Sequence, residues 1–327
     1  MGAGPLRWLA GKCASALAII ARPTLPPEQR TFTRQGYLGR YDRLRSFWAD
    51  RVRKRPYRTI TWESEFSPEL KFVIPFAYWH HLNGTLTRTV SSKGTRALYF
   101  FSNDHEERFT QRRWNDFHFP DDIPNSEDHN FRYDLSRWAA VPWRTHFRNP
   151  HFVFEKPTLV IANRYNTEWG GPPVSYLDKD TLVRLIERLS GRYTVVYNRP
   201  EARSIVNDES EVLDLGEKPF LKERFPDLVL LEDLMAHPAA PKGDLNQLQL
   251  MVYANCERFI STHGGTATLA SCFGGVNIIL SAKGQEHFFG EYRTIYPRLS
   301  GARIIALRDQ QAVLDRAFVE FLGGGTT

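Results

Sequence analysis

Residues 251–280, MVYANCERFISTHGGTATLASCFGGVNIIL, decide the fold that we expect for this chain. The segment begins with a helical apolar period and continues as a short buried strand, 258–261. The turn THGG, 262–265, follows, and a short helix then stops at two glycines before a second apolar strand at 276–280. The stretch therefore predicts a strand, a glycine turn, a helix and another strand.

The glycine turn is the first candidate ligand site. Glycines let a ligand approach the backbone closely, and the free N–H groups at the start of the following helix favour a phosphate or pyrophosphate. A tight turn that carries no ligand is the alternative. The candidate anion-binding residues here are His263, Gly264, Gly265 and Thr266.

The second half of the chain alternates short apolar runs with segments of helical period. We expect strands at 158–162, 193–197, 228–231 and 303–307, and helices at 178–189, 244–255 and 311–321. Repeats of strand and helix at this spacing predict a parallel, doubly wound sheet.

The first half is expected to form a smaller α/β unit. Residues 72–79 have the β-rich composition of a strand, 86–92 reads as a helix, and 96–101 reads as a second strand. Together the two halves predict an α/β fold of two Rossmann-like domains, 61–150 and 151–327. Each domain would hold a parallel, doubly wound sheet, and a cleft would separate the two.

Residues 1–60 are expected to form a basic N-terminal arm with a short apolar segment, and the arm is expected to be irregular over 23–60. The first 58 residues hold 13 Lys and Arg against 3 Asp and Glu, a net charge of +10, whereas the whole chain carries +6. An apolar run at 13–21 is too short to span a bilayer, which needs about 20 residues. We expect residues 1–58 to meet an anionic membrane surface, and a solvated arm and a cleaved signal peptide are the alternatives.

The amino-acid composition indicates which cellular compartment and which classes of partner to expect. The three cysteines are widely spaced, so neither a disulfide framework nor a zinc site is indicated. We therefore expect a reducing, cytoplasmic compartment, with or without peripheral attachment to a membrane. The basic arm carries no nucleic-acid motif, and we expect no nucleic-acid partner. Neither a GxGxxG after a strand nor a Walker A motif is present, which disfavours nicotinamide dehydrogenases and P-loop enzymes.

Polar residues follow the expected strands at the edge where an open parallel sheet binds ligands. Arg164 and Arg199 come after two of these strands, and Asp233 comes after a third. An arginine pairs bidentately with a pyrophosphate, and a carboxylate suits ribose hydroxyls. We expect these residues to join the glycine turn in one donor-binding crevice, with surface salt bridges as the alternative for the arginines.

Two segments carry a resemblance to a known family. Residues 159–164, LVIANR, precede Trp169, Pro173 and a helix, and residues 254–266 read ANCERFISTHGGT. The first resembles the first strand and phosphate-contacting loop of GT-B glycosyltransferases, and the second resembles their donor-diphosphate loop. The likeness is greatest to heptosyltransferase-like bacterial enzymes of surface polysaccharide assembly. The chain departs from them at 275–277, where such enzymes often carry a proline.

The same resemblance implies a general base in the first domain. Inverting GT-B enzymes often carry one in the first strand-to-helix loop, and His80 and His81 stand at the matching point of this sequence. A histidine there could accept the proton of the acceptor hydroxyl. Asp104 and Glu106 are the alternative base, and a histidine packed in the core is the structural alternative.

The resemblance implies a glycosyltransferase that moves a sugar from a nucleotide-activated donor to a glycan or lipid-linked acceptor, in surface polysaccharide biosynthesis. It implies no metal and no cofactor beyond the nucleotide-sugar co-substrate, because arginines and a helix end would stabilise the leaving diphosphate. The DxD spelling at 178–180 begins an expected helix, and an N-cap explains Asp178. The alternatives are another transfer to a glycan, such as pyruvyl transfer, and a non-catalytic protein that binds sugar nucleotides or glycans.

Overall fold

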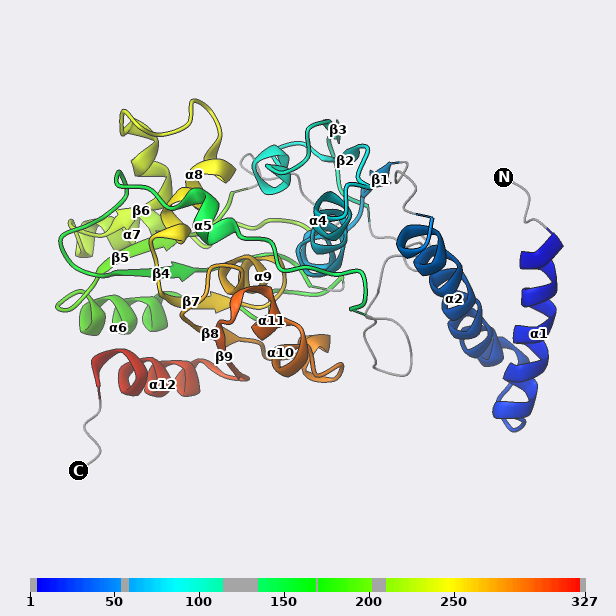
Figure 1. Ribbon diagram of the computed structural model, residues 1–327. Helices are drawn as coiled ribbons and strands as arrows, with labels where there is room; N and C mark the ends of the chain where they lie inside the picture. Colours follow the sequence, from blue (N-terminus) through cyan, green and yellow to red (C-terminus); the bar gives the residue numbers. More distant parts are fainter. Residues whose placement is uncertain (1–4, 54–58, 114–134, 169, 202–209, 324–327) are drawn as a thin grey trace.

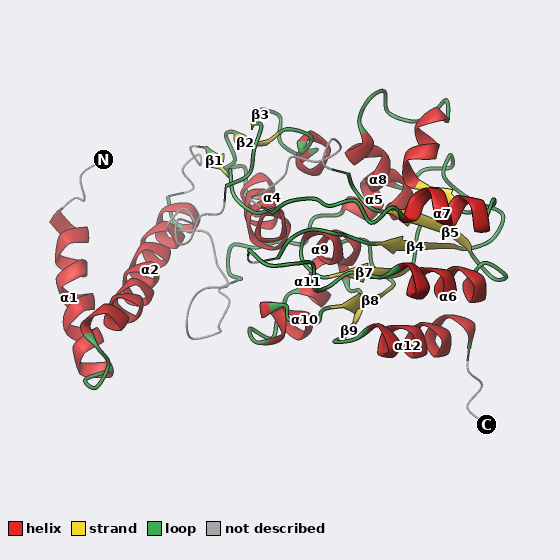
Figure 2. Cartoon of the chain, turned by 180° about the vertical axis from the view of Figure 1, so that it is seen from behind, coloured by secondary structure: helices red, strands yellow, loops and turns green. Residues whose placement is uncertain are grey.

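The computed structural model describes residues 5–53, 59–113, 135–168, 170–201 and 210–323. Its body is a six-stranded parallel sheet with helices on both faces, and a smaller unit with a three-stranded sheet packs against it (Figure 1). A hairpin of two helices projects beyond the smaller unit. Figure 2 shows the same arrangement from behind.

The six-stranded sheet has the strand order β6-β5-β4-β7-β8-β9, with every neighbouring pair parallel. Its strands are β4 Thr158–Ala162, β5 Thr194–Asn198, β6 Val229–Leu230, β7 Arg258–Thr262, β8 Val276–Leu280 and β9 Arg303–Leu307. Counted along the chain, this is the order 3-2-1-4-5-6 of the Rossmann fold. The parallel, doubly wound sheet predicted for the second half is confirmed.

Two apolar clusters lie on the two faces of this sheet, because alternate residues of a strand point to opposite sides. Leu159 and Ile161 of β4 join the first cluster, whereas Val160 and Ala162 join the second. The first cluster includes side chains of α6 Lys179–Leu189, α7 Glu217–Arg224 and α12 Gln310–Leu322. The second includes side chains of α5 Trp143–Phe147, α8 Leu245–Ala254, α9 Gly265–Ser271 and α11 Tyr296–Ser300.

Aspartate caps fix the starts of three helices in this body. Asp178, Asp244 and Asp309 each accept a hydrogen bond of 2.8 Å from the backbone N–H three residues further on. Such a cap satisfies one of the N–H groups that a helix start leaves without a partner. The interpretation of Asp178 as an N-cap is confirmed. Three short helical segments complete the body: η3 Leu231–Ala236, η4 Gln285–His287 and α10 Glu291–Thr294.

The smaller unit has a parallel sheet of order β1-β2-β3. Its elements are β1 Ile60–Thr61, α3 Phe66–Pro68, the π-helix η1 Glu69–Val73, α4 Ile74–Leu82, β2 Thr89–Ser92, the 3-10 helix η2 Arg96–Tyr99 and β3 His105–Phe109. The fold class predicted from the sequence, an α/β protein with two parallel Rossmann-like sheets, is confirmed. The placing of the domain boundary near residue 150 stays a prediction.

Three elements predicted for the smaller unit are wrong. The expected strand 72–79 lies in η1 and α4, the expected helix 86–92 contains β2, and the expected strand 96–101 contains η2. All of 70–77 is buried and Lys71 is its one charged residue, so the segment has no exposed polar face. A short run that is buried all round has the same sequence pattern as a buried strand, and periodicity cannot separate the two.

The expectation of an irregular arm at 23–60 is also wrong. The N-terminal region forms two helices, α1 Pro5–Ala21 and α2 Pro27–Arg51, which pack together as a hairpin. Pro27 stands in the first turn of α2, where its missing N–H costs no helical hydrogen bond. The rest of α2 is rich in arginine and has almost no apolar periodicity, which explains why the sequence pattern did not indicate a helix.

The two sheets are joined by a continuous core. Phe72 and Phe76 of the smaller unit belong to the same apolar cluster as Leu269 and Phe273 of the body. Polar contacts add to this junction: Ser67 and Thr268 share a hydrogen bond of 2.8 Å between their hydroxyls. The two units therefore hold a defined position relative to each other, and side chains from both form a common pocket.

Candidate functional site

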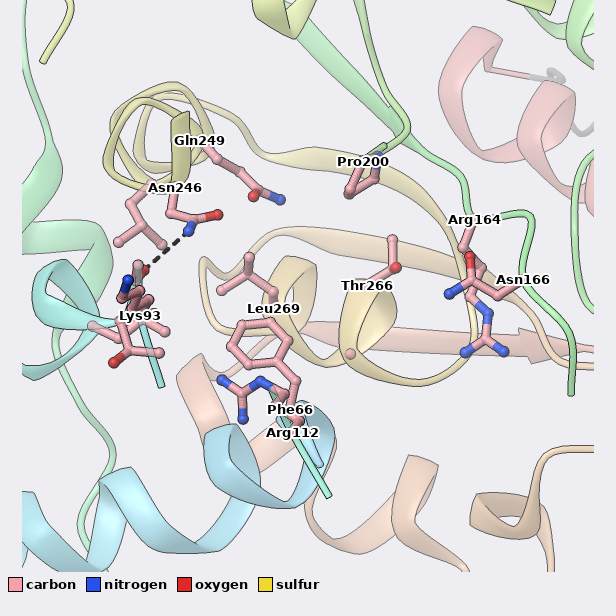
Figure 3. A pocket seen from close by; sticks show the side chains of 15 residues that line it. Phe66, Lys93, Arg112, Arg164, Asn166, Pro200, Asn246, Gln249, Thr266 and Leu269 are labelled. Carbon is pink, nitrogen blue, oxygen red and sulfur yellow. Dashed lines mark hydrogen bonds between the residues drawn. The ribbon is translucent and has the colours of Figure 1, made fainter. Parts of the chain in front are cut away.

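A pocket lies where the smaller unit meets the carboxyl ends of the body strands (Figure 3). The smaller unit contributes Phe66 from α3, Lys93 directly after β2, and Arg112. The body contributes Arg164, which follows β4, and Thr266, which follows β7. Residues far apart in the sequence thus surround one space.

The pocket sits at the point where the winding of the sheet reverses. Strands β4 and β7 are neighbours, but the chain leaves β4 for α6 on one face of the sheet and leaves β7 for α9 on the other. The two connections separate there and leave a crevice at the strand ends, which is where open α/β sheets bind ligands. Arg164 and Thr266 stand on the two sides of this crevice.

The lining of the pocket is positively charged. It contains three cations, Lys93, Arg112 and Arg164, and among the lining residues that the structure describes there is no carboxylate. Polar amides add hydrogen-bonding capacity: Asn166, Asn246 and Gln249 also line the space. Such a set of groups favours an anion with several oxygen acceptors.

The two arginines of the pocket are oriented by buried carboxylates outside its lining. Arg112 pairs with Glu69 at 2.7 Å and donates to the backbone oxygen of Ser64 at 2.8 Å. Arg164 lies 3.4 Å from Glu168, and its side chain keeps 21% of its surface exposed. Both guanidinium groups therefore have defined positions beside the pocket.

The turn requires glycine at 264 and 265, because neighbouring side chains lie where a Cβ atom would be. Gly264 has φ +82°, and a Cβ there would lie 2.7 Å from the Nη1 atom of Arg164. A Cβ on Gly265 would lie 2.8 Å from the ring of Phe66. The close approaches at this turn are made by side chains of this protein, one from each unit, and the approach of a ligand to these glycines stays a prediction. Thr266 is the residue of the predicted turn that lines the pocket together with Gly265.

His263 is not among the residues that line the pocket. Its side chain is buried, and its Nε2 atom is 3.7 Å from Glu168, which accepts a hydrogen bond of 2.9 Å from the backbone of Ser175. Burial lowers the pKa of His263 below its usual range, and the carboxylates of Glu286 and Glu168 partly oppose this effect. Glu168 was not among the predicted site residues, although it stands only four residues after Arg164 in the sequence.

Arg199 and Asp233 are not brought to the pocket. Arg199 is buried and pairs with Glu217 and, at 3.0 Å, with Asp214, so its charge holds the segment before α7. Asp233 lies in η3 and pairs with Lys222 at 3.3 Å. The expectation that both residues share one crevice with the glycine turn is therefore wrong. Both residues follow the carboxyl end of a strand, where open sheets bind ligands, but each side chain forms an ion pair with a neighbouring residue instead.

The premise for the predicted base is also wrong. His80 and His81 belong to α4 and not to a strand-to-helix loop. His80 has no exposed surface, and its Nδ1 atom lies 2.7 Å from the hydroxyl of Thr85. His81 is exposed and stacks on Tyr78. Packing explains His80, which was the structural alternative.

The alternative base pair lies on the surface of the smaller sheet. Asp104 and Glu106 both pair with Arg88, at 3.3 and 2.7 Å. None of the four candidate bases is among the residues that line the pocket. Their catalytic role stays a prediction.

No group of three or more His, Cys, Asp and Glu side chains that could hold a metal ion occurs among the described residues. The prediction that the protein works without a metal stays a prediction.

No description of a known protein family matches this sequence, and no curated protein matches it. Solved structures with a similar fold do exist. The Escherichia coli ADP-heptose lipopolysaccharide heptosyltransferase II is 12% identical at a TM-score of 0.49, with 81% of this chain and 98% of that chain covered. A glycosyl transferase family 9 protein from Veillonella parvula is 10% identical at a TM-score of 0.45, over 83% and 91%. The wall teichoic acid polymerase TagF follows at 11% identity and a TM-score of 0.30, over 96% and 88%.

The class of fold itself follows from the strand order and the two parallel sheets of this chain.

Proposed function

We propose that this protein is a glycosyltransferase that takes a nucleotide-activated sugar and binds its diphosphate in the pocket between the two units. One observation carries the proposal: a pocket at the reversal point of a Rossmann-ordered sheet is lined by three cations and by no described carboxylate. A diphosphate is the part of a sugar nucleotide that such a lining would bind most strongly.

The same cations suit the chemistry of sugar transfer. When the sugar leaves, negative charge grows on the diphosphate, and fixed cations stabilise that charge more than they stabilise the ground state. Arg164 and Arg112 are held in place by carboxylates, so little reorganisation would be needed. The reaction would then proceed without a metal and without a cofactor other than the co-substrate.

The acceptor is proposed to be a glycan or a lipid-linked glycan, used in surface polysaccharide biosynthesis. Phe66 and Lys93 come from the smaller unit and face the donor-side residues Arg164 and Thr266 across the pocket (Figure 3). An aromatic ring beside a polar rim is a surface on which a sugar ring can stack. The smaller unit would therefore present the acceptor.

A second function, the binding of sugar nucleotides or glycans without turnover, is supported by a specific observation. Among the described residues that line the pocket there is neither a histidine nor a carboxylate, so none of them is an evident general base. A transferase would need a base from the acceptor side or from a rearranged cleft. Pyruvyl transfer to a glycan lacks any separate support.

The experiment that separates these functions is a screen of sugar nucleotides with differing bases and sugars. Thermal stabilisation reports binding, and release of the nucleoside diphosphate in the presence of glycan acceptors reports transfer. Stabilisation with turnover is the expected result. Stabilisation without turnover over the whole acceptor panel would favour the binding function, and no stabilisation by any nucleotide would contradict both.

A further inference from the structure

The hairpin formed by α1 and α2, residues 5–53, projects beyond the smaller unit in both views (Figures 1 and 2). Helix α1 packs along α2, and Arg7 pairs with Asp42 across the two helices at 3.1 Å. The far end of α2 is joined to the smaller unit, where buried Asp50 pairs with Arg137 at 2.8 Å. The hairpin is therefore anchored at one end, and most of its length lies apart from the body, beyond the smaller unit.

Helix α1 buries its small residues. Gly11, Ala14 and Ala18 are the buried residues of this helix, and they recur at the spacing of one helix face. Small side chains let two helix backbones approach closely, which is the usual packing between helices in lipid. A helix on the surface of a water-soluble domain normally does the reverse and buries its large apolar residues.

The large apolar residues of α1 are exposed instead. Leu6, Leu9, Leu17 and Ile20 are 72%, 53%, 47% and 75% exposed, and their spacing places them along one side of the helix. Exposed Leu44 and Trp48 add a second apolar stripe on α2, one helical turn apart. A contiguous exposed apolar surface of this kind is typical of a site that binds a membrane or another molecule.

The exposed charges of the hairpin are all of one sign. Among the described side chains of residues 5–53, every charged one that is exposed is a lysine or an arginine: Lys12, Arg22, Arg34, Arg40, Arg45, Arg51 and Arg53. The described acids Asp42 and Asp50 are buried in ion pairs. Apolar side chains surrounded by cations form the surface pattern of a helix that lies in the headgroup region of an anionic bilayer.

We propose that the hairpin docks this protein on the surface of an anionic lipid bilayer, with the stripe of α1 inserted among the lipids. A second copy of the chain is a poorer occupant, because it would bring the same cations into contact. No helix in the described part of the chain is long and apolar enough to cross a membrane. The proposal does not depend on the proposed transfer reaction.

The test is co-sedimentation of the full-length protein with large vesicles. One set contains phosphatidylcholine alone, and the other contains phosphatidylcholine with phosphatidylglycerol. We expect sedimentation with the anionic set only, and we expect it to weaken as salt rises toward 0.5 M, because counterions screen the attraction, with a Debye length of about 3 Å at 1 M. Equal sedimentation with both sets, or with neither, would overturn the proposal.

Two hairpin variants test the surface itself. Leu17→Ser with Ile20→Ser should weaken partitioning about 100-fold, since each buried side chain is worth about tenfold. Arg40→Gln with Arg45→Gln should weaken it about 25-fold at low salt, at about fivefold for each cation. The control for the serine variant is the double variant Val153→Ser with Val319→Ser. The control for the glutamine variant is Lys242→Gln with Lys283→Gln. Both controls alter exposed residues of the body. These controls should sediment as the unmodified protein does.

A retained melting temperature shows that the hairpin variants still fold. Sedimentation of either hairpin variant at the level of its control would overturn the proposal. A concentration-dependent dimer that forms without lipid and is lost in the serine variant would also overturn it, because the stripe would then be an interface between copies of the chain.

Discussion

Arg164 and Arg199 both follow a strand of the body, yet the structure uses them in different ways. Arg164 lines the pocket and leaves part of its side chain exposed, whereas Arg199 is buried against Glu217 and Asp214. The arginine side chain is long and flexible, so it can form an ion pair with any carboxylate that lies within its reach. Position after a strand therefore limits where an arginine can reach, but the local carboxylates decide where it does reach.

The first prediction concerns Arg164→Met, which keeps the apolar stem and removes the charge. We expect binding of the best sugar nucleotide from the screen to weaken by about 1–3 kcal/mol, the range of a lost charged hydrogen bond. Titration calorimetry measures this change. Arg184→Met is the control, because Arg184 lies on the outer surface of α6 and pairs with Gln311. Unchanged affinity in Arg164→Met would show that the anion site has been placed wrongly.

The second prediction concerns His80→Ala. Because His80 is fully buried and bonded to Thr85, we expect the variant to lose about 1–3 kcal/mol of unfolding free energy. Urea denaturation measures this loss. Exposed His81→Ala is the matched control and should stay within about 0.5 kcal/mol of the unmodified protein. Full stability together with lost transfer activity in His80→Ala would restore this residue as a candidate base.

At the scale of elements, the smaller sheet depends on a buried neutral histidine. His105 of β3 lies 2.8 Å from the hydroxyl of Thr89 and 3.2 Å from that of Thr95, and its ring stacks on Tyr99. Burial lowers the pKa of His105 to about 4, with Arg96 acting in the same direction and Glu107 against it. The folded chain therefore keeps this imidazole neutral at pH values where the unfolded chain protonates it.

This pKa shift predicts a dependence of stability on pH. Between about pH 6.5 and 4 the unfolded state binds a proton at His105 that the folded state does not, so stability falls as the pH is lowered through this window. We expect His105→Gln to be less stable at pH 7 and to show a shallower loss toward pH 4. Chemical denaturation across that range measures the slope. Exposed His151→Gln should keep the original slope, and an unchanged slope in His105→Gln would contradict the prediction.

At the scale of the whole molecule, the junction between the two units contains a buried ion pair. Lys71 of η1 and Glu291 of α10 form it, and both side chains are almost wholly buried. Burial alone would lower the pKa of Lys71, but Glu291 and Glu286 raise it above its usual range, so the lysine stays charged. Opposite charges at this point help to define how the units meet.

The fourth prediction is that Lys71→Met costs about 3–5 kcal/mol of unfolding free energy, because it leaves a buried carboxylate without its cation. The double variant with Glu291→Leu should recover most of this loss, since two apolar side chains then meet. Denaturation of the two single variants and the double variant forms the complete cycle. If Lys71→Met alone changes stability by less than about 0.5 kcal/mol, the ion pair does not hold the junction.

The sequence determined most of the body by itself. Strands 158–162, 276–280 and 303–307 were predicted with the bounds that β4, β8 and β9 have, because each is a buried run between turn residues. Their alternation with capped helices was enough to predict the parallel sheet, and from it the crevice beside Arg164 and Gly265. These strands and capped helices could be predicted because each depends on a pattern within a few neighbouring residues.

Only the tertiary structure decided the smaller unit and the other half of the pocket. The buried segment 70–77 has no exposed polar face to reveal its helical period, and contacts with the body select a helix. Phe66, Lys93 and Arg112 line the pocket because the two units share a core. No local sequence pattern identifies a residue whose position depends on packing against a distant part of the chain. Burial and long-range ion pairs depend on the whole fold, which is why His80 and Arg199 were assigned to the site from sequence and lie elsewhere in the structure.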